Sequence, residues 1–115
     1  MTALADLRAA YRARNPPMSE DDFQTRVMDV AKRCGWMVCH YLPAIRQSGK
    51  VSTAIKGDRG APDLILARRG VVLLVELKTN KGTVSPDQQR WLDALDGYGS
   101  VWRPRDWDEV VRALR

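Results

Sequence analysis

The sequence contains little cysteine and histidine, with two cysteines and one histidine in 115 residues. Four residues separate Cys34 from Cys39, a spacing that fits neither a zinc knuckle nor a redox CxxC pair. Two cysteines are also too few to staple a secreted domain of this size. These absences exclude a zinc finger and a disulfide scaffold, and we interpret both cysteines as small core residues in a reducing compartment.

Long apolar runs are also absent. The longest uninterrupted one, residues 71–75, is far too short to cross a bilayer. Residues 1–6 lack the basic stretch and the apolar stretch of a signal peptide. We therefore expect a cytoplasmic protein without a membrane span.

Acidic residues are outnumbered, because 14 Asp and Glu stand against 19 Lys and Arg and leave a formal net charge of +5. The excess is local: residues 43–83 hold eight basic residues against Asp58, Asp63 and Glu76, whereas the flanking segments nearly cancel. With 44% hydrophobic residues, the chain has the composition of one globular domain. The charge predicts an anionic partner, nucleic acid first.

The N-terminal half shows two helical patterns and one strand. Residues 3–14 have helical spacing and end at the prolines of residues 15–17, which we interpret as a linker. Ser19 precedes three acidic residues and marks the start of a second helix, which ends at Gly35. Its predicted apolar face consists of Phe23, Val27, Val30, Ala31 and Cys34. A strand over residues 36–42 and a long connection over residues 43–62 follow.

The C-terminal half predicts a β-hairpin, a helix, a strand and a last helix. Residues 63–67 and 71–78 are apolar runs around a short break, and the second strand should be central and covered on both faces. Ser85-Pro86 is a strong helix start, with Trp91, Leu92 and Leu95 on the inner face. A strand over residues 100–103 precedes a helix capped by residues 106–109. The element order indicates an α/β fold with a mixed sheet flanked by helices.

The hairpin carries the chemistry. If Arg69-Gly70 is a two-residue turn, Asp63 lies opposite Glu76, and Lys78 projects from the same face as Glu76. Two facing carboxylates repel each other unless a cation lies between them, and oxygen ligands suit Mg²⁺ or Mn²⁺. A three-residue turn would shift this register by one residue. The alternative is a plain surface ion pair between Glu76 and Lys78 at the strand end.

A third carboxylate precedes this hairpin. Glu20 shares a helical face with Val27 and Ala31, which predicts that it points toward the sheet near the helix N-terminus. A first-turn cap is the competing interpretation, and either Asp21 or Asp22 could take the place of Glu20.

Together these motifs resemble the PD-(D/E)xK nuclease superfamily and, within it, a stand-alone VRR-NUC domain of phage and bacterial genomes. The motifs are Glu20 with Phe23-Gln24, Gly60-x-Pro62-Asp63, Glu76-x-Lys78 and Ser85-Pro86-x-Gln88. The resemblance runs from about Ser19 to the C-terminus. It implies a restriction-endonuclease-like core over residues 18–115, in the order α-β-β-β-α-β-α, with residues 1–17 as an extra N-terminal helix and proline linker.

The resemblance also implies a role for each residue. Asp63, Glu76 and the backbone carbonyl of Leu77 would bind a catalytic Mg²⁺ or Mn²⁺, and Glu20 would complete the site directly or through water. Lys78 would orient the attacking water and stabilise charge on the phosphate. Gln88 would support the site from the following helix.

The implied activity is a Mg²⁺-dependent endonuclease that hydrolyses DNA. Its substrate would be branched DNA such as a Holliday junction, cut by a homodimer in a bacterial or phage-infected cell. The alternatives are a catalytically silent nucleic-acid-binding module and an accessory subunit of a recombination or packaging complex. Intact Asp63, Glu76 and Lys78 argue against a silent module.

Basic residues beside the hairpin are predicted to contact DNA phosphates. They are Arg46, Lys50, Lys56 and Arg59 in the long connection, and Lys81 after the second strand. His40 is interpreted as structural because it lies in a mostly apolar strand. The four tryptophans follow amphipathic spacing, which favours packing in the core and at its rim over a platform for stacking bases.

Overall fold

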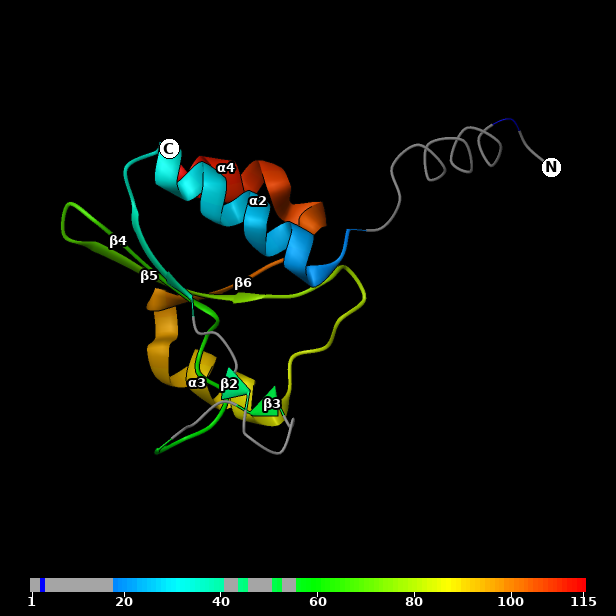
Figure 1. Ribbon diagram of the computed structural model, residues 1–115, viewed down its shortest axis with the longest axis vertical. Helices are drawn as coiled ribbons and strands as arrows, with labels where there is room; N and C mark the ends of the chain where they lie inside the picture. Colours follow the sequence, from blue (N-terminus) through cyan, green and yellow to red (C-terminus); the bar gives the residue numbers. More distant parts are fainter. Residues whose placement is uncertain (1–2, 4–17, 41–43, 46–50, 53–55) are drawn as a thin grey trace.

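A four-stranded mixed sheet in the order β1-β4-β5-β6 lies between layers of helices (Figure 1). β1 (Met37–His40), β4 (Leu64–Arg68) and β5 (Val71–Leu77) are antiparallel neighbours, and β6 (Gly99–Trp102) pairs parallel with β5. This computed structural model describes Ala3 and residues 18–40, 44–45, 51–52 and 56–115. The predicted N-terminal helix, apart from Ala3, and the proline linker lie outside the described residues.

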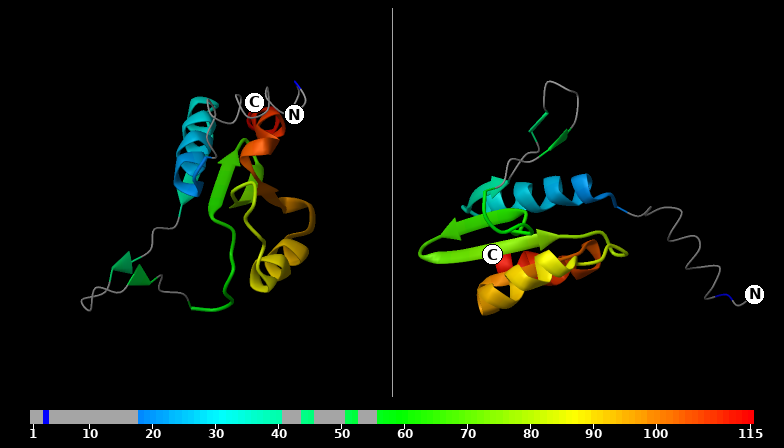
Figure 2. Two further views of the ribbon diagram at one scale, coloured as in Figure 1. Left: turned by 90° about the vertical axis from the view of Figure 1, so that its right-hand side faces the viewer. Right: turned by 90° about the horizontal axis from the view of Figure 1, so that it is seen from below.

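Among the described residues, three α-helices cover the sheet. α2 (Glu20–Arg33) and α4 (Trp107–Leu114) lie side by side on one face, and α3 (Pro86–Leu95) lies on the other side (Figures 1 and 2). Two short 3-10 helices, η1 (Asp96–Tyr98) and η2 (Pro104–Asp106), flank β6. In the described part of the chain no helix is both long and apolar enough to span a membrane. The predicted α/β architecture is confirmed.

The start of α2 follows the sequence signal. The Ser19 hydroxyl accepts a hydrogen bond from the Asp22 backbone N–H at 3.1 Å, which satisfies one of the free donors of the first turn. Phe23, Val27 and Ala31 are fully buried at the predicted helical spacing.

The hairpin register is the predicted one. Arg69 and Gly70 form the turn with φ of 50° and 79°, the left-handed pair that matches strand twist in a two-residue hairpin. Arg68 pairs with Val71, and Leu64 pairs with Val75. The ladder continued by one residue therefore places Asp63 opposite Glu76.

The core lies between the sheet and the α2–α4 layer. Val75 and Leu77 of β5 are buried there together with Phe23, Val27, Ala31, Leu64, Leu66, Val110 and Leu114. Successive side chains of a strand point to opposite faces. Glu76 and Lys78 therefore point to the face on which α3 lies.

Four local expectations were wrong, wholly or in part. Cys39 is exposed because it lies on the open face of an edge strand, whereas Cys34 is half-buried and packs against the core as predicted. The connection over residues 43–62 contains a small antiparallel ladder of β2 (Ala44–Ile45) and β3 (Val51–Ser52). β5 is central, yet its first residues are exposed where the hairpin ends. Asp106 is the N-cap residue of α4 as predicted, but its carboxylate makes no capping hydrogen bond to the helix and accepts one from the Arg103 backbone N–H.

Candidate active site

Two carboxyl groups meet where β4 begins and β5 ends. Asp63 directly precedes β4, and its Oδ2 accepts a hydrogen bond from the Leu77 backbone N–H at 2.8 Å. The last backbone pair between β4 and β5 is Leu64 with Val75. Just beyond it, the Asp63 side chain takes the place of a backbone partner for Leu77. The Glu76 side chain, 3% exposed, lies within interaction range of the Asp63 carboxyl. The sequence prediction that the two carboxyl groups face each other is confirmed.

The environment of Glu76 disfavours its charged form. Burial, and then the negative charge of Asp63, raise the pKa of Glu76 from 4.5 to about 8, although the Lys78 ammonium lowers it in part. A raised pKa favours the protonated carboxyl at neutral pH, and added positive charge beside Glu76 would favour the anion.

Lys78 and Gln88 both bind the Glu76 side chain. Lys78 Nζ lies 3.6 Å from Glu76 Oε1, and Gln88 Nε2 donates a hydrogen bond to the same oxygen at 2.8 Å. The Lys78 side chain is 14% exposed, so the surface ion pair considered as an alternative does not describe it. The site residues Asp63, Glu76, Lys78 and Gln88 thus form one cluster.

A capping box orients the Gln88 amide. Ser85 Oγ accepts the Gln88 backbone N–H at 3.2 Å, and Gln88 Oε1 accepts the Ser85 backbone N–H at 2.9 Å. Because the amide oxygen is held by Ser85, the amide nitrogen points to Glu76. The local signal that starts α3 therefore also positions a partner for the buried carboxyl.

The Leu77 backbone faces Asp63. Lys78 N–H donates to the Trp102 carbonyl at 3.1 Å, so Lys78 directs its backbone N–H toward β6. Neighbouring residues of a strand direct their backbone groups to opposite sides, which turns the N–H and the carbonyl of Leu77 to the side of β4. The carbonyl that the resemblance assigns to a metal is thus on the side where Asp63 lies.

Gly60 joins the Asp63 segment to α3. It has φ of +92°, and a Cβ there would lie 2.6 Å from the Asp87 carbonyl carbon and 2.8 Å from the Gln88 backbone nitrogen. Only glycine fits such a close approach between two backbones. The segment that presents Asp63 therefore packs directly on the turn of α3 that presents Gln88.

We expect Gly60→Ala to lower the free energy of unfolding by about 2–4 kcal/mol, from strained backbone plus overpacking. Gly57→Ala is the matched control, since Gly57 has φ of +107° and a Cβ there would have no neighbouring atom within 4 Å. It should cost about 1 kcal/mol. Urea denaturation of both variants measures the difference. Equal losses would show that the contact with α3 contributes nothing.

Two contacts of this site were not predicted. Arg103 Nη1 donates to the carbonyls of Thr79 and Gly82, each at 2.6 Å, and so fixes the loop that follows Lys78. His40 Nδ1 lies 3.3 Å from the Asp63 carbonyl. Both contacts depend on pairing between distant strands, for which no local sequence signal exists. His40 thus contacts the backbone of a site residue from the neighbouring strand.

The third carboxylate does not join the cluster. Glu20 is exposed, as are Asp21 and Asp22, so the prediction that Glu20 points inward was wrong. α2 packs on the face of the sheet opposite to the one toward which Glu76 points, and first-turn side chains project past the helix end. Within residues 18–40 and 56–115, and in the short β2 and β3 strands, no three His, Cys, Asp or Glu residues form a metal-binding group. A metal role for Glu20, Asp21 or Asp22 stays a prediction.

The predicted DNA-binding residues divide by position. Lys56, Arg59 and Lys81 are exposed, whereas Arg46 and Lys50 lie outside the described residues. Arg68, which adds to the charge of this segment, has a structural role. Its guanidinium donates to the carbonyls of Cys34, Leu114 and Arg115 and stacks on the Trp36 ring.

The cluster fits a hard divalent cation. Asp63 and Glu76 supply carboxylate oxygens, the ligands that Mg²⁺ prefers. Burial and then the charge of Asp63 raise the pKa of Glu76, and positive charge beside the two carboxyl groups would offset the repulsion between them. A bound cation would replace the proton on Glu76 and remove the repulsion from Asp63.

A family model matches most of the chain. The model described as the VRR-NUC domain matches residues 20–101, more than half of the chain. The chain belongs to the VRR-NUC family. The matched range of this VRR-NUC domain includes all four clustered residues, whereas the resemblance was expected to reach the C-terminus and the match ends at residue 101. Comparisons with curated proteins and with solved structures give no significant match. Membership indicates a nuclease, and DNA is the substrate that a nuclease domain implies.

Proposed function

We propose that this VRR-NUC domain is a Mg²⁺-dependent endonuclease that hydrolyses phosphodiester bonds in branched DNA such as Holliday junctions. The observation that carries the proposal is the cluster of Asp63, Glu76 and Lys78, with both carboxyl groups on facing strand ends and the ammonium 3.6 Å from Glu76. Family membership supports the nuclease activity.

In this proposal Asp63 and Glu76 hold the metal, and the Leu77 carbonyl is the third protein ligand. An ion held there would lower the pKa of a coordinated water and stabilise negative charge on the phosphate. Gln88 keeps one Glu76 oxygen in place, so that the carboxylate does not rotate away. Lys78 holds its charge beside Glu76, where it can orient the attacking water and stabilise the transition state.

The described residues of each chain contain one such cluster, whereas resolution of a junction needs two cuts. The proposal therefore includes a homodimer, in which two sites act on two strands. We also propose that the protein acts in the cytoplasm of a bacterium or of a phage-infected host cell. That compartment is compatible with the free thiols of Cys34 and Cys39.

Cleavage of two substrates tests the proposal. The purified chain is incubated with a labelled four-way junction and with a linear duplex of the same arm sequence, each in Mg²⁺ and in EDTA. We expect Mg²⁺-dependent cleavage of the junction at least about 10-fold faster than that of the duplex, because only the junction presents a branch to both sites of a dimer.

Each other outcome removes a defined part of the proposal. Cleavage of the duplex with an uncut junction would overturn the substrate class and keep the nuclease. Binding of both DNAs without any cleavage in Mg²⁺ or Mn²⁺ would overturn the nuclease and favour a silent binding module. Equal cleavage in EDTA would overturn the metal dependence.

A further inference from the structure

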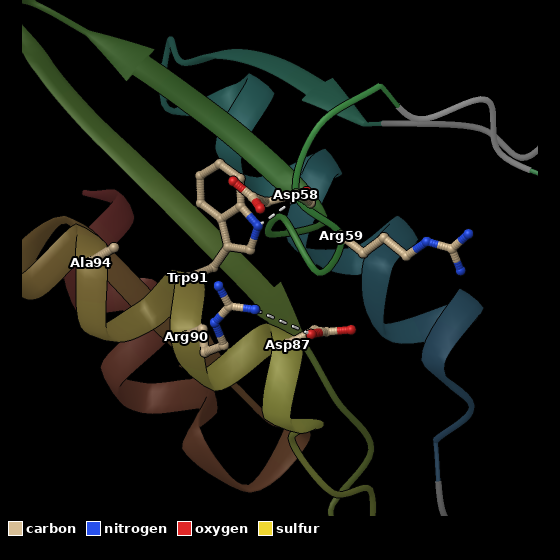
Figure 3. A pocket seen from close by; sticks show the side chains of 6 residues that line it. All are labelled: Asp58, Arg59, Asp87, Arg90, Trp91 and Ala94. Atoms are coloured by element: carbon tan, nitrogen blue, oxygen red, sulfur yellow. Dashed lines mark hydrogen bonds and ion pairs between the residues drawn. The ribbon is translucent and has the colours of Figure 1, made fainter.

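A small cavity opens beside the active site, between residues 58–59 and α3 (Figure 3). It has a volume of about 220 Å³ and is lined by Asp58, Arg59, Asp87, Arg90, Trp91 and Ala94. Trp91 extends from the helix toward Asp58, and its indole N–H donates to the Asp58 carbonyl at 3.3 Å. One edge of the ring is therefore held while the side chain stays half-exposed.

The lining of this cavity suits a nucleobase. The indole offers an aromatic surface, on which a base can stack whatever its identity. Asp58, Asp87 and Arg90 lie at the rim, so it can accept and donate hydrogen bonds at a base edge. The Asp87 carboxylate lies 3.8 Å from the Arg90 guanidinium, so Asp58 is the rim carboxylate that would repel a bare phosphate. The volume is below the ~300–1,000 Å³ of typical drug-sized ligand sites, which favours a single ring system over a whole nucleotide pair.

The cavity and the active site share their walls. Asp87 and Trp91 flank Gln88 on α3, and Gln88 donates to Glu76. On the other wall Gly60 packs on the backbone of Asp87, three residues before Asp63. Trp91 lies three residues after Gln88, a spacing at which two helical residues have Cβ atoms about 5–6 Å apart, so the cavity adjoins the turn of α3 that presents Gln88 to Glu76.

We propose that this cavity is a subsite for one unpaired base of the bound DNA strand, stacked on Trp91 next to the phosphate that is cut. The inference rests on the proposed nuclease function. The Arg59 side chain extends away from the helix, where it can contact the phosphate of the same nucleotide (Figure 3). A stacked base in this position has to leave its duplex partner, and branch points and strand ends supply such bases at least cost.

The test uses the Lys78→Ala variant, in which the expected loss of cleavage rate leaves most of the DNA uncut in Mg²⁺ during a binding measurement. Junction arms carry 2-aminopurine, or an abasic residue, at each position along one strand near the branch. We expect one position at which 2-aminopurine fluorescence falls on binding, and at which the abasic residue weakens binding about 10-fold. This scan needs no change at Trp91 and therefore does not depend on the folding of a variant at that position.

Variants then assign the effect to the cavity. Trp91→Leu in the same background should weaken binding about 10-fold and remove the quenching, whereas Trp91→Phe should bind within about 3-fold of the parent. Tyr98→Leu is the control, because Tyr98 is an aromatic residue 67% exposed just after α3 and outside the cavity. It should leave binding unchanged.

The inference is overturned by a flat 2-aminopurine and abasic scan, or by Trp91→Leu binding as the parent does. Either result with wild-type cleavage intact leaves the nuclease standing and removes only the subsite. Quenching at one position, together with a wild type that never cleaves, would support the subsite and overturn the nuclease.

Discussion

The Glu76→Gln variant is expected to be more stable than the wild type at pH 9 and nearly equal to it at pH 5, when both are free of metal. Folding raises the pKa of Glu76 from 4.5 to about 8, so the folded state holds this proton more tightly than the unfolded state does. The associated stability is fully present below pH 4.5 and is lost as the pH rises through about 8. Each pKa unit corresponds to about 1.4 kcal/mol, so the expected loss is a few kcal/mol.

Glutamine removes this loss because it is neutral at every pH and keeps an oxygen for the Gln88 amide. Urea denaturation in EDTA at the two pH values measures the effect. Glu109→Gln is the control, since Glu109 is exposed on α4 and its replacement should change stability by less than about 0.5 kcal/mol. A stability difference between Glu76→Gln and wild type that is the same at pH 5 and pH 9 would refute the assigned pKa.

Added Mg²⁺ should reverse the pH dependence of the wild type. The ion competes with the proton on Glu76, so Mg²⁺ should raise the melting temperature more at pH 9 than at pH 6. Glu76→Gln should show little Mg²⁺ response at either pH. On this account, the metal-free protein loses stability at high pH because Glu76 and Asp63 are placed together to bind a cation.

The second large effect is expected for Lys78→Ala, which should cleave DNA at least about 10²-fold more slowly while it still binds Mg²⁺. Lys78 supplies a charge in a nearly buried site, and the loss of one such group from a transition state costs about 10²–10³ in rate. The carboxyl ligands remain in Lys78→Ala, so Mg²⁺ affinity by calorimetry should change by less than about 10-fold. Single-turnover cleavage at saturating Mg²⁺ gives the rate.

Lys32→Ala is the matched control for this loss. Lys32 is exposed in the last turn of α2, on the other side of the sheet, so its removal should leave cleavage within about 2-fold. Lys78→Arg keeps the positive charge on a side chain of different shape. Its cleavage rate should lie between those of Lys78→Ala and Lys32→Ala. A Lys78→Ala protein that cuts DNA at the wild-type rate would remove Lys78 from the catalytic machinery.

The part of the site that could be predicted from sequence is the part built by local rules. A two-residue turn at Arg69-Gly70 determines the register of the hairpin, and that register brings Asp63 opposite Glu76. The capping signal at Ser85 starts α3 and so positions Gln88. The hairpin register and the position of Gln88 both follow from residue spacing along the chain, without knowledge of the rest of the fold.

The remaining contacts depend on how distant elements meet. The spacing of Glu20 along α2 gives its helical face, but it does not say on which side of the sheet that face packs. His40 reaches Asp63 only through the pairing of β1 with β4, and Arg103 reaches the loop after Lys78 only through the parallel pairing of β5 with β6. The need for glycine at position 60 likewise comes from α3, which begins 26 residues later.

The initial rate of DNA cleavage by wild type and by Asp63→Asn, measured across a Mg²⁺ titration, tests the central claim most directly. Asparagine keeps an oxygen that can accept the Leu77 N–H but lacks the charge that would hold the ion. The account predicts that the wild type cuts DNA only when Mg²⁺ is present and that Asp63→Asn loses at least about 10²-fold in rate. Cleavage by Asp63→Asn at the wild-type rate across the titration would contradict it.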